Sequence, residues 1–270
     1  HLLLPACRPA GSSAIGRSAT LGSTRPAVIA SLAMYPFPQV RDATNQLWKS
    51  VRTNLGWGPA ELEWNVLTPT VWHEPNLLLA QCCGWPLAAE LPDSMAVVGT
   101  FDYAVPDSMN GTYRSVIVTG THRSLDELRA DPSTLAAVND HSSLSGWISL
   151  QHTWGGEPQN FVTAAHIESC RAVIAGRAQV ACIDAVSFDM FGEFEPAAVA
   201  GLRIIGQGPR IPCLPIFVPA QHAAKIPELR RAFAAAMVDP ALDAARAALR
   251  IRGFVPFDRS DYTTLLTLLA

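Results

Sequence analysis

The sequence predicts an α/β protein of two lobes, each built on a mainly parallel sheet flanked by helices, with two hinge crossings between them. Short apolar runs alternate with helical patterns from Pro26 onward, which is typical of sheets covered by helices. Two segments rich in turn-forming residues, 104–111 and 206–212, bracket a stretch with the same alternation. The chain of 270 residues is 49% hydrophobic, enough for two modest domains.

Ten short apolar runs are predicted to be strands, which is more than one compact sheet of a chain this long would hold. The predicted strands cover residues 27–32, 64–67, 77–80, 96–100, 115–118, 136–139, 161–163, 179–183, 202–205 and 216–218.

Helices are predicted where apolar residues recur at helical spacing. One such run covers residues 47–55, and another covers residues 167–174 ahead of Gly176, a residue that commonly ends a helix. A further helix is expected after Pro75, because proline is favoured in the first turn. We interpret Trp72, just before it, as structural or peripheral.

The predicted lobes divide the chain at the two turn-rich segments. Residues 27–108 and 209–270 form lobe 1, including alanine-rich helices after Pro227, and residues 109–208 form lobe 2. Two crossings let such lobes close on a ligand held in the cleft between them. Residues 1–26 are expected to be a disordered tail, because small residues, proline and arginine dominate there and hydrophobic periodicity is absent.

Composition excludes several classes of function. The net charge of -3, without a basic cluster, argues against a nucleic-acid partner. The six cysteines show no CxxC spacing, so neither a zinc site nor a disulfide scaffold is indicated, and no cofactor or metal is expected. The alanine-rich stretch 232–250 is interrupted by charged residues and by Pro240, so it is not predicted to cross a membrane.

The first candidate site is a serine-rich turn between a predicted strand and a helical pattern. It holds Ser142, Ser143 and Ser145. The start of a helix offers unpaired N–H groups and a positive dipole end, which suit a phosphate-like oxyanion. The alternative is that one of these serines simply caps the helix.

Two further polar side chains follow strands of lobe 2. His166 opens a helix and could donate to an anion, although it could equally be a capping or solvated residue. Asp184 ends an apolar run and could accept from a protonated oxygen or an amine, or could cap the helix that follows. Because the carboxyl ends of parallel strands meet at one edge of a sheet, we expect both to join the serine turn in one crevice.

Lobe 1 contributes candidates that also follow predicted strands. They are Tyr35, Tyr103 and the group Cys83, Gly84 and Trp85. An aromatic residue can present an apolar face and a polar atom to a small ligand, although core packing is its commoner fate.

In their order along the chain, these features resemble the phosphate/phosphite/phosphonate type of ABC-transporter substrate-binding protein over about residues 28–218. The resemblance is carried by Tyr35, Gln81-Cys82-Cys83-Gly84-Trp85-Pro86-Leu87, Val97 to Tyr103, Tyr113-Arg114-Ser115, Val138-Asn139-Asp140, Ser143-Leu144-Ser145-Gly146, His166 and Ala181-Cys182-Ile183-Asp184.

The resemblance implies a type 2 periplasmic-binding-protein fold that clamps a small phosphate-like or phosphonate-like anion without transforming it. Membrane subunits of an ABC transporter would be its partners. We expect a monomer, periplasmic or membrane-anchored outside the cytoplasm; no complete signal peptide is visible, so a cytoplasmic location is the alternative. The residues that the resemblance assigns to the ligand are Ser142, Ser143, Ser145, His166 and Asp184 from lobe 2, with Tyr35, Trp85 and Tyr103 from lobe 1.

Two other functions stay open at this point. The same fold could carry an enzyme in which Cys83 or His166 performs chemistry, provided that a nucleophile lies beside a base. It could also bind ferric iron through Tyr35, Tyr103, His166 and Asp184, with the serine turn holding an accompanying anion.

Overall fold

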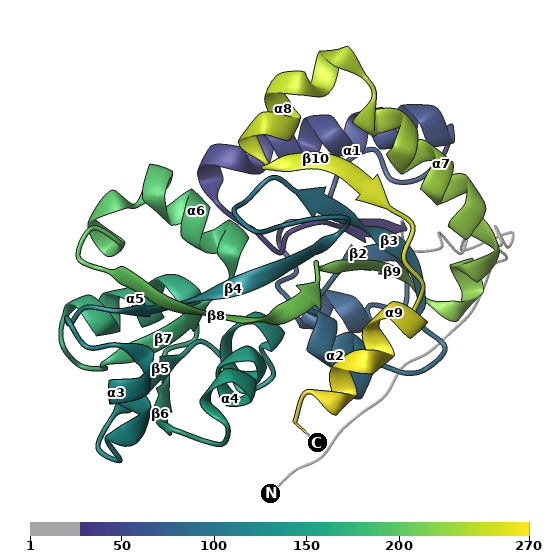
Figure 1. Cartoon of the computed structure of the whole chain (residues 1–270). Helices are drawn as coiled ribbons and strands as arrows, with labels where there is room; N and C mark the ends of the chain where they lie inside the picture. Colours follow the sequence, from purple (N-terminus) through teal and green to yellow (C-terminus); the bar gives the residue numbers. More distant parts are fainter. Residues whose placement is uncertain (1–27, 270) are drawn as a thin grey trace, which may run out of the picture.

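The computed structural model describes residues 28–269, which form two five-stranded sheets flanked by helices (Figure 1). The tail predicted for residues 1–26 lies outside the described part. We call the halves built on the two sheets lobe 1 and lobe 2. The lobe 1 sheet has the order β1 (Ile29–Ser31), β2 (Leu77–Gln81), β9 (Pro215–Val218), β3 (Ala96–Tyr103) and β10 (Ile251–Val255). The lobe 2 sheet has the order β6 (Gln159–Val162), β5 (Leu135–Val138), β7 (Val180–Ile183), β4 (Thr112–Thr119) and β8 (Arg203–Pro212).

Both sheets are mixed, so the prediction of mainly parallel sheets is wrong. In the described residues, parallel pairing is limited to β1 with β2 in lobe 1, and to β5 with β6 and β7 in lobe 2. The reason is the route of the chain, which leaves lobe 1 between β3 and β4 and returns between β8 and β9. Strands that run out and back are antiparallel, and β4 pairs with β8 along its whole length (Figure 1). The residue limits proposed for the lobes stay a prediction.

All but one of the predicted strands correspond to strands of the structure, and one strand of the structure was not predicted. Residues 64–67 form an irregular bend, in which the Glu63 carboxylate accepts hydrogen bonds from the backbone N–H groups of Asn65 and Val66. Strand β10 was missed, because the sequence around it was interpreted as helical. It pairs antiparallel with β3, a partner that lies about 150 residues earlier and is invisible to local pattern.

The turn-rich segment 206–212 is part of strand β8, not a turn. Its glycines are needed for packing against neighbouring helices. A Cβ at Gly208 would lie 3.0 Å from Cβ of Ser149, and a Cβ at Gly206 would lie 3.0 Å from Leu125 Cδ2. Glycine in a strand therefore marks close approach here, as it often does in sheets.

The helices of lobe 1 pack mainly on one another and on the sheet. α1 buries Leu47, Trp48 and Val51 and ends at Gly56 in the left-handed conformation, and α7 packs alongside it, as the alanine-rich pattern predicts. No helix follows Pro75, contrary to the prediction. A 3₁₀ turn, Thr70–His73, precedes Pro75, and strand β2 begins two residues after it. The helices of lobe 1 are α1 (Arg41–Leu55), α2 (Gly84–Ala89), α7 (Ile226–Met237), α8 (Asp243–Ala248) and α9 (Ser260–Thr263).

Lobe 2 carries α3 (Leu125–Ala130), α4 (Ser149–Trp154), α5 (His166–Ile174) and α6 (Ala185–Phe194). On α5, Cys170 and Val173 are buried as the periodicity predicts, but Ile174 is 40% exposed. Across residues 28–269, we find no helix whose length and apolar character would let it cross a membrane.

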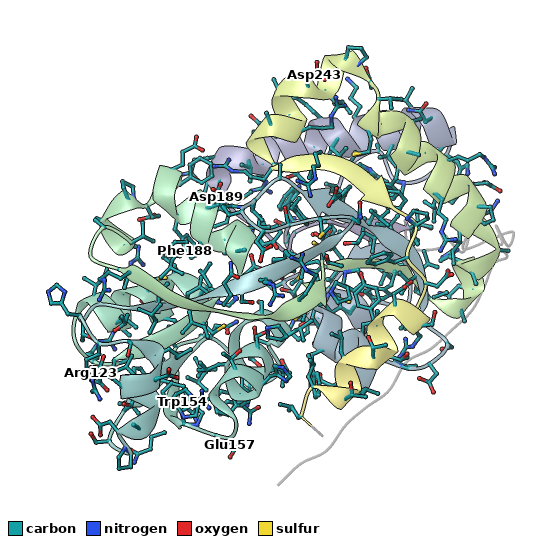
Figure 2. All side chains as sticks on the ribbon, viewed as in Figure 1. Arg123, Trp154, Glu157, Phe188, Asp189 and Asp243 are labelled. Carbon is teal, nitrogen blue, oxygen red and sulfur yellow. The ribbon has the colours of Figure 1, made fainter. Side chains whose placement is uncertain are left out.

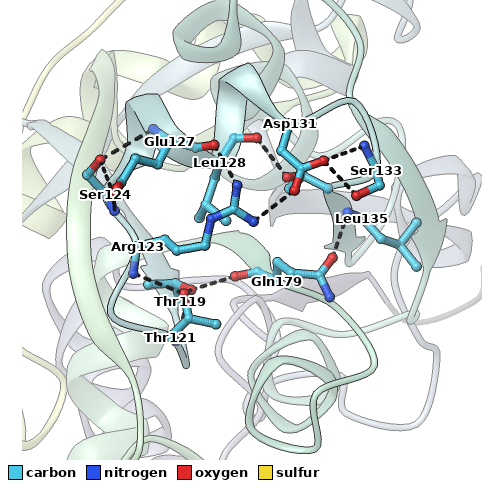
Figure 3. A network of polar contacts seen from close by, with 11 residues as sticks. Thr119, Thr121, Arg123, Ser124, Glu127, Leu128, Asp131, Ser133, Leu135 and Gln179 are labelled. Atoms are coloured by element: carbon cyan, nitrogen blue, oxygen red, sulfur yellow. Dashed lines mark hydrogen bonds and ion pairs between the residues drawn. The ribbon is translucent and has the colours of Figure 1, made fainter.

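A polar network lies at the end of the lobe 2 sheet where strands β5 and β7 begin (Figure 3). Thr119 Oγ1 donates to the carbonyl of Gln179 at 2.6 Å, and the Gln179 side chain accepts from the N–H of Leu135 at 2.8 Å. Arg123 pairs with Asp131 at 3.0 Å beside the capping box that starts α3. Because β5 and β7 are parallel, their carboxyl ends meet at the opposite edge, where the candidate site lies.

An ion-pair group joins the two lobes beyond the covalent crossings. Arg250, just before β10 in lobe 1, pairs with Asp189 at 2.7 Å and with Glu193, both on α6 of lobe 2. Figure 2 labels Asp189 on the side of α6 near the start of β10. The Arg250 side chain is only 13% exposed, so its hydrogen bonds are partly shielded from solvent.

We predict that Arg250→Ala lowers the free energy of unfolding by about 1.5–3 kcal/mol, because it removes charge-assisted hydrogen bonds from a shielded position. The control Arg171→Ala removes an exposed pair within lobe 2 and should cost less than about 1 kcal/mol. Urea unfolding of both variants measures the difference. If both substitutions lowered the free energy of unfolding by the same amount, the interlobe ion pairs would stabilise the protein no more than exposed surface ion pairs do.

Candidate functional site

A cavity of about 310 Å³ lies between the lobes and is lined by both of them. Seven of the ten residues singled out in the sequence line it: Tyr35, Cys83, Ser142, Ser143, Ser145, His166 and Asp184. The remaining lining residues are Met34, Thr68, Pro69, Trp72, Pro86, Glu90, Asn139, Asp140, Ala165, Ser187 and Leu214.

The lobe 2 side of the cavity is built at the carboxyl ends of three adjacent parallel strands. The serine turn follows β5, His166 follows β6 and Asp184 follows β7. Since β6, β5 and β7 are neighbours in that order, their following residues meet at one edge. The structure therefore brings these three features together; that they bind a ligand stays a prediction.

The serine turn opens a helix that begins with a π-helical turn, Leu144–Ile148, and continues as α4. Ser143 caps it, since its Oγ accepts from the N–H of Gly146 at 3.0 Å. The capping alternative is thus correct for Ser143, yet its hydroxyl proton remains available to donate. Ser142 is engaged locally, because its Oγ and N–H both contact Asp140 Oδ1, at 2.6 and 2.7 Å. π-Helical turns of this kind are frequent at functional sites.

Gly146 is fixed by the side chain of Asn139. A Cβ at Gly146 would lie 1.9 Å from Asn139 Oδ1, so no larger residue fits. That oxygen is buried and has no hydrogen-bond partner among the described residues. Asn139 was quoted only as part of the resemblance and not as a site residue; the sequence signal for it was its place directly after β5, in front of the serine turn.

His166 links the start of α5 to the serine turn. Its Nε2 lies 3.2 Å from Ser145 Oγ, whereas its Nδ1 is buried without a partner within the described part of the chain. Burial lowers the pKa of His166, against the smaller opposing effect of Asp184. The ring is therefore neutral at pH 7 and carries a single N–H donor.

Asp184 is a buried carboxylate held by donors from both lobes. It is 3% exposed. Its Oδ1 accepts from the N–H of Ser187 at 2.7 Å, which caps α6. Its Oδ2 accepts from Tyr113 Oη at 2.6 Å and from Tyr35 Oη at 3.2 Å. The capping alternative is thus correct for Asp184, which also lines the cavity; that it accepts a hydrogen bond from a ligand stays a prediction.

The two tyrosines stay protonated. Desolvation first, and then the charge of Asp184, raise the pKa of Tyr35 and of Tyr113 well above the ordinary value. Tyr113 lies on β4 and was quoted only as part of the resemblance, not as a site residue. Because Tyr35 comes from lobe 1 and Tyr113 from lobe 2, the carboxylate bridges the two lobes.

Three predicted site residues do not line the cavity. A Cβ at Gly84 would lie 2.8 Å from Leu144 Cδ2, so Gly84 permits close packing of α2 on lobe 2. Trp85 packs against the hydrophobic core. Tyr103 accepts a hydrogen bond from Gln81 Nε2 at 3.1 Å and places its ring 5.6 Å from that of Tyr35. It therefore supports Tyr35 from within the core.

Trp72 has a structural role, as interpreted from the sequence, and it also lines the cavity. It is 7% exposed, and its Nε1 donates to the carbonyl of Gln81 at 3.1 Å. The 3₁₀ turn after Pro69 turns it inward. No local sequence signal marks that turn, so the tertiary contact with β2 decides the orientation.

The cavity is lined by neutral donors and acidic side chains. Glu90, Asp140 and Asp184 contribute carboxyl groups, and among the described residues no lysine or arginine lines it. An anion bound here must therefore rely on hydroxyl, amide and imidazole donors.

The enzyme and ferric alternatives gain no support from this arrangement. Burial raises the pKa of the Cys83 thiol, whose sulfur accepts from the N–H of Leu144 at 3.3 Å, so it is a poor nucleophile. Ser145 and His166 form a pair, but Asp184 is bonded to the tyrosines and Ser187 rather than to the imidazole. Of the four residues considered as ferric ligands, Tyr103 does not line the cavity.

The family model described as "ABC transporter, phosphonate, periplasmic substrate-binding protein" matches residues 96–262. This match covers more than half of the chain. The chain belongs to the phosphonate substrate-binding family. No curated protein sequence matches it.

Solved structures of binding proteins with different ligands have a similar fold. A binding protein component of a phosphonate ABC transporter from Pseudomonas aeruginosa has a TM-score of 0.69 at 14% identity, covering 90% of this chain and 85% of that one. A Prochlorococcus marinus protein in complex with methylphosphonate has a TM-score of 0.68 at 12% identity, covering 90% and 96%. A Xanthomonas citri protein bound to ATP has a TM-score of 0.62 at 14% identity, covering 90% and 95%. At these identities the likeness shows the fold.

His166 makes a testable contribution to pH dependence. Its folded pKa lies below the unfolded value of 6.5, so between those two values the unfolded chain binds more protons than the folded one. The free energy of unfolding should therefore fall as pH drops below 6.5 and level off below the folded pKa. We predict that His166→Asn weakens this fall. Denaturation of both proteins at pH 7.5 and 5.5 tests it, and equal slopes would contradict it.

Proposed function

We propose that the protein captures a small phosphonate-like or phosphate-like oxyanion in the interlobe cavity and delivers it to the membrane subunits of an ABC transporter. The observation that carries the proposal is the convergence of the serine turn, a helix start and His166 in one cavity between lobes. The family match and the methylphosphonate held by the Prochlorococcus marinus protein support this ligand class. Action in the periplasm follows the family, and a monomer stays a prediction.

Neutral donors suffice for such an anion. Each hydrogen bond from a hydroxyl or N–H to an anionic oxygen is charge-assisted and stronger than a neutral one. The positive end of the helix dipole at the serine turn adds to this attraction. Ser143 and Ser145 are both largely buried, so their hydroxyls are shielded from competing water.

The acidic groups favour a ligand that also carries a cation. Glu90 lies in lobe 1 after α2, and Asp140 lies in lobe 2 within the serine turn; both line the cavity. A phosphonate alone gains nothing from them, whereas an ammonium group on the same ligand is attracted by both. We therefore propose aminoalkylphosphonates as the second candidate, ahead of inorganic phosphate.

Ser145→Ala tests the anion site. We expect it to weaken methylphosphonate binding about tenfold or more, because a hydrogen bond to a charged group is worth about 1.5–3 kcal/mol. Calorimetric titration measures the change, after a thermal-shift screen of phosphate, phosphite and phosphonates has found the best ligand. Ser133→Ala, exposed in the Figure 3 network, is the control. Unchanged affinity in the Ser145 variant would place the site elsewhere.

Glu90→Gln tests the choice of ligand charge. We expect about fivefold weaker binding of aminoethylphosphonate, with methylphosphonate bound equally well or better, since one attractive charge is lost from a partly solvated cavity. Glu61→Gln, exposed and outside the cavity, is the control. Titration of both ligands against each variant gives the ratio of dissociation constants. A ratio that does not move would contradict the aminoalkyl preference.

A further inference from the structure

A second hollow adjoins the polar cavity and differs from it in chemistry. It measures about 260 Å³ and shares five lining residues with the first, among them Tyr35, His166 and Ser187. Its own walls are Pro36, Phe37 and Pro38 of lobe 1 and Ile167 and Phe191 of lobe 2. We call this hollow the apolar annex.

The annex offers little to a charged or strongly polar group. No side chain that lines it carries a formal charge at neutral pH, since burial keeps His166 neutral. Its two prolines have no N–H to donate. The Tyr35 hydroxyl is already bonded to Asp184. Hydrocarbon is therefore the chemistry that the annex fits.

The annex is formed by the same approach of the lobes that forms the polar cavity. The ring of Phe37, from lobe 1, lies 5.5 Å from that of Phe191 and 5.8 Å from that of Phe194, both on α6 of lobe 2. A ligand that reached both hollows would thus contact both lobes twice, once through polar groups and once through apolar ones.

We propose that the annex receives the organic substituent of a phosphonate whose head group occupies the polar cavity. This inference rests on the proposed function, which it deepens by naming the ligand as an alkyl- or aryl-substituted phosphonate. Inorganic phosphate and phosphite would leave the annex without a partner. The protein would then bind organic phosphonates more tightly than inorganic phosphate because it buries their apolar substituent in the annex, next to Tyr35 and His166.

The test is a calorimetric titration of the parent protein with phosphate and with methyl-, ethyl-, propyl- and butylphosphonate. We expect affinity to rise about fourfold per methylene from methyl to propyl, the fold-change that corresponds to roughly 0.8 kcal/mol per buried CH₂. Flat or falling affinity along the series, with methylphosphonate bound, overturns the annex and leaves the proposed function standing. No binding of any member by the folded protein overturns both.

Two variants on helix α5 locate the effect. Ile167→Trp fills the annex and should bring the ratio of methyl to propyl dissociation constants close to one. Ile174→Trp adds the same bulk at a position on α5 that is 40% exposed and outside the annex, and should keep the ratio of the parent. If both variants keep that ratio, the substituent lies elsewhere and the inference is wrong.

Discussion

The carboxylate of Asp184 is the constraint on which the interlobe site depends. It is buried, and within residues 28–269 no lysine or arginine forms an ion pair with it. Three donors stabilise it: the N–H of Ser187 and the hydroxyls of Tyr35 and Tyr113. A buried charge that loses one donor becomes costly. The Asp184 carboxylate therefore fixes three parts of the structure relative to one another: helix α6, the Tyr35 ring of lobe 1 and strand β4. Arg250 of lobe 1 forms ion pairs with Asp189 and Glu193, so it also links α6 to lobe 1.

The hydrogen-bond donors that line the cavity are neutral and preorganised. The Asn139 side chain packs against Gly146 of the helix start so closely that no Cβ fits there. The neutral ring of His166 contacts Ser145 in the serine turn. Hydroxyl and amide donors are directional, so they favour one arrangement of acceptor oxygens, and the carboxyl groups of Glu90 and Asp140 lie in the same wall.

The two crossings explain why the sheets are mixed and why glycines occur where turns were expected. Since β4 and β8 carry the chain out and back, they must pair antiparallel, and helices α3 and α4 pack on β8 at Gly206 and Gly208. The cavity and the annex then arise at the same interface. One presents polar atoms from the ends of parallel strands, and the other presents rings and prolines from the segment after β1 and from α6.

By itself, the sequence determined the α/β class, most strands, the buried faces of α1 and α5, and the meeting of the serine turn, His166 and Asp184, because these depend on local periodicity and on the rule that parallel strands end at a common edge. Only the tertiary structure decided the antiparallel pairings, strand β10, the inward position of Trp72 and the packing of Gly84, Trp85 and Tyr103 away from the cavity wall. Each of these depends on contacts between residues far apart in the chain. Local residue patterns carry no information about such contacts, since the same aromatic or glycine fits a core, a close approach or a ligand site equally well.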